Sequence, residues 1–517
     1  MDSQLRQDRI LILDCGGSYA QLVARRVRDL AVYCEVLPSR ASRERLLQNE
    51  YSGVIITGDP RASRNPTIDP ILFELDIPIL AIGYAALILN RLLGGSTEPG
   101  ERQESGTSEL EILKPDELFS GEVPSPSPVW LSSGDRIATV PEGFTVTAHT
   151  ADFPVAAMSD PERRIFALQF HPEIRDTAAG ETMLESFLRG ICGCSAEWKM
   201  SAFVEQTVAG LRERLAGRQV LCAFSGGVDS SVAAMLVHRA IGHRLLCIFV
   251  DHGLHRKNEA ADIERVFREH YDLNLVCVDA RDRFLGRLEG VTDPETKRKI
   301  IGEEFIRVFE EEATKARASM GEIDVLVQGT IYPDVIESGG DASTMVKSHH
   351  NVGGLPKDIG FTELVEPLRD LFKDEVRRVG MELGMPENLV WRQPCPGPGL
   401  AVRIIGAITP ERVAILQNAD TIYREEIDNA GLSREISQYF AVLTDMRSVG
   451  VKHDRRTYDY TVALRAVSTT DFMTADWVRL PMPVLEQVSS RIVSEVEHVN
   501  RVVYDITAKP PATIEWE

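Results

Sequence analysis

Short apolar runs alternate with helical patterns along most of this chain. Each run spans only a few residues and is almost continuously apolar, which is typical of parallel strands that are buried on both faces. Most runs end in a turn or at an acidic or polar residue. The predicted strands are residues 10–14, 53–58, 77–82, 164–170, 220–224, 245–250, 273–278 and 323–327. The pattern therefore predicts an α/β architecture.

The alternation changes character after about residue 392. Residues 462–465 and 502–506 are strand-like, and a helical pattern over 484–496 lies between them. These elements predict a small α+β domain at the end of the chain. We therefore divide the chain into three predicted domains, with a doubly wound sheet in the middle one: residues 1–199, 200–392 and 393–517.

One predicted strand, residues 220–224, runs into a loop of small residues before a helical pattern begins. Two adjacent glycines allow a tight turn and a close approach to a ligand. Backbone N–H groups at such a turn, and at the start of the following helix, form an anion site. The candidate phosphate-binding residues are Ser225, Gly226, Gly227, Val228, Asp229, Ser230 and Ser231.

This loop lacks the Gly-x4-Gly-Lys-Ser/Thr spacing of a Walker A motif. It resembles instead the pyrophosphate loop of the ATP pyrophosphatases, which split ATP between the α and β phosphates. The alternative is an ordinary strand-to-helix turn made of small residues. We favour the pyrophosphate loop because strand, loop and helix follow one another in the required order.

Composition narrows the classes of function. The net charge of −21 over 517 residues argues against nonspecific nucleic-acid binding. No apolar run is long enough to span a membrane, and the N-terminus lacks the apolar region of a signal peptide. Several of the eight cysteines lie inside apolar runs, as expected in a reducing cytoplasm. Cys192-Gly193-Cys194 has no matching second pair, so we expect no metal site there.

Motifs spread over residues 200–517 closely resemble the GMP synthetase family, whose members aminate xanthosine monophosphate (XMP) to GMP. The N-terminal region resembles a class I glutamine amidotransferase, so the resemblance spans essentially the whole chain. The segments that carry it in the last two regions are residues 250–257, 290–295, 297–299, 328–334, 347–356, 391–394, 396–400 and 509–517.

The resemblance implies ATP and Mg²⁺ as cofactors and an adenylated XMP intermediate. Adenylation turns the C2 oxygen of XMP into a good leaving group, and pyrophosphate leaves with Mg²⁺ assistance. The family assigns XMP binding to residues that match Arg256 and Lys509, with Glu515 near the base. Lys347 falls in a segment expected to be a lid that excludes water. His349-His350 could by composition be a metal pair, but we favour a role in the same lid segment.

The amidotransferase resemblance places a catalytic histidine and glutamate at His171 and Glu173. At the nucleophile position, however, Gly83 replaces the family's cysteine. Leu87 replaces its glutamine-binding residue, and Asp59 introduces an acidic side chain into the Gly-Gly-Pro loop that stabilises the oxyanion. Glycine carries no nucleophile, so we expect no glutamine hydrolysis. The nitrogen source is then expected to be ammonia, either free or from an external donor.

Two further departures from the family lie in the synthetase half. His252 replaces an asparagine and could alter specificity for the nucleotide or acceptor, and His453-Asp454-Arg455 replaces a Gly-Asp-Gly loop. Two alternatives therefore stay open, namely a ligase that acts on another purine nucleotide or nucleophile and a non-catalytic regulator that pairs with an active paralogue. The last domain resembles the family's dimerisation domain, which implies a homodimer.

Overall fold

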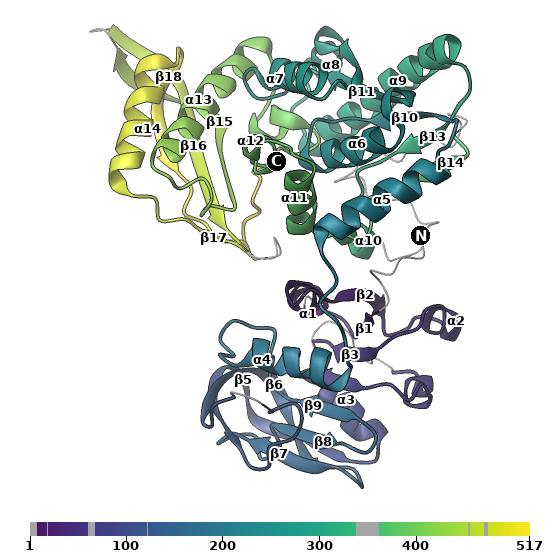
Figure 1. The fold of residues 1–517 in the computed structure, drawn as a ribbon. Coiled ribbons are helices and arrows are strands. Elements are labelled where there is room, and N and C mark those ends of the chain that lie inside the picture. Colours follow the sequence, from purple (N-terminus) through teal and green to yellow (C-terminus); the bar gives the residue numbers. More distant parts are fainter. Residues whose placement is uncertain are drawn as a thin grey trace. The chain divides into compact units, whose positions relative to one another are not determined.

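A computed structural model describes residues 8–17, 19–59, 68–120, 123–337, 361–452, 455–469 and 474–517. The chain divides into two compact units, Met1–Phe203 and Val204–Glu517, and Figure 1 shows the fold of each. Helix α5 (Met200–Arg214) spans the boundary between them.

A nine-stranded sheet, in the order β2-β1-β3-β4-β9-β8-β7-β5-β6, organises the first unit. Strands β2, β1, β3, β4 and β9 are parallel, and the remaining four pair antiparallel. The strands are β1 (Arg9–Asp14), β2 (Tyr33–Pro38), β3 (Gly53–Thr57), β4 (Ile79–Ile82), β5 (Ser96–Ile112), β6 (Ser127–Thr139), β7 (Thr145–His149), β8 (Ala157–Asp160) and β9 (Ile165–Leu168).

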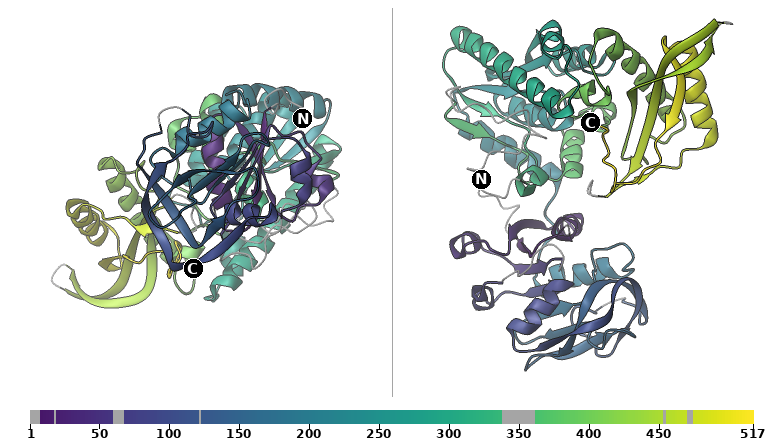
Figure 2. Two further views of the ribbon diagram at one scale, coloured as in Figure 1. Left: turned by 90° about the horizontal axis from the view of Figure 1, so that it is seen from below. Right: turned by 180° about the vertical axis from the view of Figure 1, so that it is seen from behind.

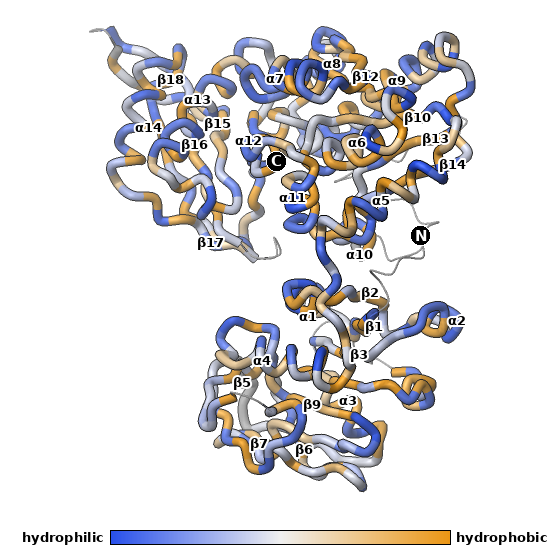
Figure 3. The backbone as a smooth tube through the Cα atoms, viewed as in Figure 1, coloured by the Kyte–Doolittle hydropathy of each residue, from blue (hydrophilic) through white to orange (hydrophobic). Residues whose placement is uncertain are grey.

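Helix α1 (Tyr19–Asp29) of this unit buries one apolar stripe. Its buried Ala20, Val23, Ala24 and Val27 recur at helical spacing, and Figure 3 shows hydrophobic and hydrophilic residues alternating along it. The other helices are α2 (Arg43–Leu46), the 3₁₀ helix η2 (Pro70–Glu74), α3 (Tyr84–Leu92), α4 (Gly180–Glu185) and the π-helix η3 (Ser186–Ile191).

The second unit holds a five-stranded parallel sheet in the order β12-β11-β10-β13-β14. The chain builds outward from β10 through β11 to β12 and then returns to the other side of β10. The strand order therefore reverses beside β10, and open α/β sheets bind ligands at such a switch point. The strands are β10 (Gln219–Ala223), β11 (Leu245–Asp251), β12 (Asn274–Asp279), β13 (Ile323–Val327) and β14 (Glu363–Val365).

Helices connect the strands of this sheet (Figure 1). The α-helices are α6 (Val228–Ile241), α7 (Glu259–Arg265), α8 (Arg281–Arg287), α9 (Pro294–Met320), α10 (Tyr332–Glu337), α11 (Lys373–Glu382) and α12 (Glu387–Val390). The shorter 3₁₀ and π segments are η4 (Gly242–Arg244), η5 (Val266–His270) and η6 (Gly399–Arg403).

A second sheet of the same unit joins β15 (Gln438–Lys452), β16 (Arg455–Ser468), β17 (Asp476–Trp477) and β18 (Val499–Tyr504). Helices α13 (Pro410–Asn429) and α14 (Met482–Glu495) lie along it (Figure 2). Residues of both sheets and both helices share one buried core, from Leu221 to Val499. Division of this unit at residue 392 thus stays a prediction.

The predicted fold class is confirmed, and most predicted strands agree with the observed ones to within a few residues. The strand predicted over 462–465 is the middle of the longer β16. The strand predicted over 77–82 begins only at Ile79, because Pro78 has no N–H to donate to a neighbouring strand. The strand predicted over 502–506 begins earlier, at Val499, where it pairs in parallel with β16.

Candidate active site

The loop after β10 turns tightly into α6. Gly226 adopts φ +71°, and a Cβ there would lie 2.4 Å from Cδ1 of Ile263, so the turn requires glycine. The Ser225 and Ser230 hydroxyls lie 3.0 Å apart, and Ser230 donates to the Gly227 carbonyl at 3.1 Å. No described side chain caps the N-terminus of α6. Its first N–H groups therefore remain suited to an anion.

Asp229, in the first turn of α6, combines a paired and an unpaired carboxylate oxygen. Its Oδ2 accepts a bond from Lys373 Nζ at 2.5 Å. Among the described atoms its buried Oδ1 has no hydrogen-bond partner. An unpaired carboxylate oxygen beside a phosphate-binding turn is a suitable ligand for Mg²⁺.

Sequence reasoning missed Lys373, which lies 144 residues from Asp229 in the chain. The sequence alone gives no signal that pairs the two residues. Lys373 is the first residue of α11, and a cation at the N-terminus of a helix opposes the helix dipole. Such a placement needs a compensating anion, which Asp229 supplies.

The strand end beside the loop approaches it closely. Gly329 follows β13, and a Cβ there would lie 2.8 Å from the backbone of Asp229 and Ser230. Thr330, the next residue, donates to Glu366 at 2.5 Å. The predicted loop residues and the predicted segment after β13 therefore meet at the switch point.

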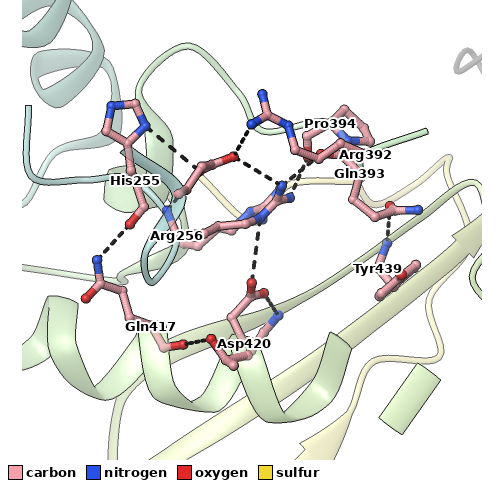
Figure 4. Close-up of polar contacts among 12 residues, drawn as sticks. His255, Arg256, Arg392, Gln393, Pro394, Gln417, Asp420 and Tyr439 are labelled. Atoms are coloured by element: carbon pink, nitrogen blue, oxygen red, sulfur yellow. Dashed lines mark hydrogen bonds and ion pairs between the residues drawn. The ribbon is translucent and has the colours of Figure 1, made fainter. Parts of the chain in front are cut away.

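Arg256 lies in a buried polar network (Figure 4). Its guanidinium donates to the carbonyls of Gln393 and Pro394, each at 2.8 Å, and its Nε lies 3.6 Å from Asp420. Burial raises the pKa of Glu259, but Arg392 and Arg256 outweigh that effect and hold the pKa at about 2. Arg256, which is 3% exposed, is thus engaged by protein groups.

The structure describes some, but not all, of the residues predicted to bind XMP. Glu515 accepts two bonds from Arg403, at 3.0 and 2.7 Å, and one from Gln438 at 2.8 Å. The backbone of Lys509 pairs with Ala475. Lys347, with His349 and His350, lies outside the described residues, as do His453 and Asp454.

In the first unit, His171 and Glu173 form the expected pair. His171 Nδ1 lies 2.8 Å from Glu173 Oε1, and both side chains are buried. The Tyr19 ring stacks on the imidazole with centroids 4.2 Å apart. Gly83 lies between β4 and α3 at φ +60°, and a Cβ added there would approach His171 Nε2 to 2.7 Å. The imidazole therefore borders directly on the position where a nucleophile would begin.

The structure also describes the two other positions at which this chain departs from the amidotransferase pattern. Leu87 is buried in α3, and Asp59 donates its backbone N–H to the Gly16 carbonyl at 2.8 Å. Cys15 is 2% exposed, and burial raises the pKa of its thiol to about 11. A thiol is not a nucleophile until it is deprotonated, so burial disfavours Cys15 as a substitute nucleophile.

Comparison with known proteins identifies the family of this chain. A GMP synthase from Ruminiclostridium cellulolyticum, named as glutamine-hydrolyzing, is 56% identical over 99% of this chain and 100% of its own length. The chain belongs to the GMP synthase family. Its likewise named relative from Acetivibrio thermocellus is 57% identical over 99% of this chain and 100% of that protein.

Three family models match separate segments of the chain, and each segment contributes to a different sheet. Residues 11–191 match the glutamine amidotransferase class-I family, and residues 218–279 match the tRNA methyl transferase HUP domain. Residues 425–516 match the GMP synthase C terminal domain. Within the described residues, no helix has the length and apolar character that crossing a membrane requires.

His252, one departure from the GMP synthase family pattern, points into the protein. Its Nδ1 accepts the Leu254 N–H at 2.9 Å, and its ring stacks on His255 at 4.0 Å and meets Phe305 edge-on. Burial lowers the pKa of His252 well below its usual value of 6.5. The side chain thus stabilises a turn much as an asparagine would.

Proposed function

We propose that this chain catalyses the ATP-dependent amination of XMP to GMP, with AMP and pyrophosphate as the other products. The observation that carries the proposal is the glycine- and serine-rich turn at residues 225–231, at the switch point of a parallel sheet. The family membership of the full chain adds the identity of the acceptor.

The loop amides and serine hydroxyls would bind the phosphates of ATP. Lys373 lies beside Asp229 and would add positive charge where pyrophosphate departs. The unpaired Asp229 Oδ1 fits a role in holding Mg²⁺, which neutralises phosphate charge when bound. Attack of the XMP C2 oxygen on the α-phosphorus would then release pyrophosphate and give the adenylated intermediate. Ammonia would attack C2 of this intermediate, and the C2–O bond would break as AMP leaves.

XMP recognition is assigned to the C-terminal region. Arg403 and Gln438 hold the Glu515 carboxylate in one orientation, as a group that reads a base edge requires. Lys509 and Lys347 would supply positive charge toward the XMP phosphate and the intermediate. The buried contacts of Arg256 favour a positioning role over direct phosphate contact.

We propose ammonia, free or from an external donor, as the nitrogen source. Gly83 brings no nucleophile to the His171–Glu173 pair. Hydrolysis of glutamine would require a group that attacks its side-chain carbonyl. Without such a group, the histidine and glutamate would be remnants of that chemistry. We also propose a homodimer and a cytoplasmic location.

GMP formation from XMP and MgATP, with ammonium chloride and glutamine in parallel reactions, tests the proposal. We expect product with ammonium chloride alone and no glutamate release from glutamine. Product with glutamine, accompanied by glutamate release from homogeneous protein, would overturn the assignment of the nitrogen source. No product in either reaction would favour an altered acceptor, and no pyrophosphate release with any purine nucleotide would favour a regulator.

A further inference from the structure

Arg392 connects the pyrophosphate loop with the helix that packs over it. One guanidinium nitrogen, Nη2, donates to the Gly226 carbonyl. The other, Nη1, lies 3.1 Å from Glu259 Oε1. The side chain is 16% exposed, so these contacts form in surroundings that screen charge weakly. Figure 4 shows Arg392 above Arg256 in the network.

Glu259 begins α7, and Ile263 follows one turn later on the same face. Ile263 fills the space beside Gly226, where a Cβ would lie 2.4 Å from its Cδ1. The same helix therefore contacts the loop in two ways. Ile263 packs on it directly, and Glu259 reaches it through Arg392.

The position of Glu259 is itself fixed. Its Oε2 accepts the backbone N–H of Arg256 at 3.0 Å. Arg256 is in turn held by the carbonyls of residues 393 and 394 and by Asp420, whose Oδ1 accepts the Ala441 N–H at 3.0 Å. The loop contact is therefore part of a buried series of polar contacts that reaches α13 and β15.

We infer that Arg392, oriented by Glu259, is a positioning residue that holds the Gly226–Gly227 turn in the shape that binds the ATP phosphates. The inference rests on the proposed function, because it assigns this loop to ATP. A guanidinium suits this task since its fixed planar fork serves the carbonyl and the carboxylate at once. A lysine keeps the charge but presents a single nitrogen and cannot span both groups.

The test uses the full chain with Arg392→Lys, and Arg244→Lys as its matched control. Arg244 also donates to a backbone carbonyl, that of Leu215 at 2.9 Å, but it lies just before β11, at the opposite end of that strand from the site. Three quantities are measured for each variant: the dissociation constant of MgATP by equilibrium titration, hydrogen exchange of the peptide covering residues 225–231, and the KM for XMP.

We expect Arg392→Lys to raise the MgATP dissociation constant about tenfold, which corresponds to about 1.4 kcal/mol. Exchange in residues 225–231 should accelerate, while the KM for XMP and every value of Arg244→Lys stay near those of the unsubstituted protein. Equal MgATP affinity and equal exchange in the two variants would overturn the inference.

Glu259→Gln provides a second variant if Arg392→Lys does not fold. It keeps an acceptor for Arg392 but removes the charge, so we expect a smaller rise in the same dissociation constant, and no rise would overturn the inference. Binding of MgATP requires no turnover. Failure of the unsubstituted protein to form GMP would therefore overturn the proposed function while these binding measurements still decide the role of Arg392.

Discussion

At residue 83, the absence of a side chain leaves room for the imidazole ring of His171. The Tyr19 ring stacks on the His171 imidazole, and Glu173 holds its Nδ1. The ring is therefore fixed from two sides and borders the Cα of Gly83. A side chain at this position would meet a ring that has little room to withdraw.

The substitution Gly83→Cys should accordingly fail to confer glutamine hydrolysis. Its Cβ would begin 2.6 Å from His171 Cε1, and its backbone would keep φ +60°. We expect no glutamate release, a loss of stability of about 1–3 kcal/mol from backbone strain, and unchanged ammonia-dependent activity. Enzymatic glutamate detection and thermal unfolding provide the measurements, with Gly83→Ala as a control for the added Cβ. Glutamate release at the rate of GMP formation would contradict this account.

Asp229 carries a different expectation, because its carboxylate belongs to the proposed chemistry. Replacement by asparagine removes the charge that pairs with Lys373 and the proposed Mg²⁺ ligand. We expect Asp229→Asn to lower the rate of pyrophosphate release by about 10²-fold, with the thermal unfolding midpoint little changed. The exposed Asp262, changed to asparagine, provides the matched control. Equal pyrophosphate release by the two variants would remove Asp229 from the mechanism.

At the scale of elements, the central parallel strands could be predicted because burial on both faces leaves a nearly continuous apolar signal. Strands without that signal were not predicted, among them β5 to β8 and β15. The loop between β10 and α6 could be predicted because its residues are consecutive. Lys373 and Arg392 could not be predicted, because they reach the loop from 144 and 166 residues away. Only the path of the chain through α11 and residue 392 brings those cations to the loop.

Arg256 and His252 illustrate a related limit. The family resemblance assigns Arg256 to XMP binding, and the departure from the family pattern leaves a specificity role open for His252. In the structure, Arg256 donates to the carbonyls of Gln393 and Pro394, and His252 accepts the Leu254 N–H within the turn after β11. A sequence motif identifies a turn at this place but does not tell which of its side chains face a ligand.

This turn should make the stability of the second unit depend on pH. Burial lowers the pKa of both His252 and His255 in the folded chain. Once pH falls below 6.5, the unfolded chain binds more protons than the folded one. Stability is therefore complete above pH 6.5 and declines as pH falls, by up to about 1.4 kcal/mol per pH unit for each histidine.

Denaturant unfolding between pH 7.5 and 5 measures this slope, since ordinary carboxylates stay largely charged there. His252→Asn should flatten the slope and leave the kinetic constants for XMP and ATP within about twofold, because asparagine also accepts a bond from the N–H two residues on. A slope as steep as that of the unsubstituted chain would contradict the role given to His252. A change in acceptor specificity in His252→Asn would instead favour the specificity role that the sequence left open for His252.

At the scale of the whole molecule, the changes at the amidotransferase site contrast with the extent of the likeness. The chain matches proteins named as glutamine-hydrolyzing over essentially its whole length. Gly83, however, lies at the turn from β4 into α3, Leu87 lies in the first turn of α3, and Asp59 lies just after the neighbouring strand, β3. Under the proposed loss of glutamine hydrolysis, a few substitutions at one sheet edge would remove a reaction while the architecture that carried it persists.

The proposed homodimer makes a prediction of its own at this scale. Val449 on β15 is paired with Tyr458 on β16, so their side chains share one face of the hairpin, and Val451 follows on that face. The three side chains are 48%, 63% and 76% exposed in the order 449, 458, 451. Adjacent exposed apolar groups of this size favour burial against another surface.

We expect sedimentation to report a particle of twice the 57.4 kDa chain mass. Val451→Asp should shift that particle toward the monomer, because an unpaired carboxylate resists transfer from water into an apolar interface. Leu113→Asp is the matched control, since Leu113 is a 58% exposed apolar residue of the first unit. A monomeric unsubstituted chain would overturn the dimer itself. A Val451→Asp variant that stays dimeric would move the interface to another face of the molecule.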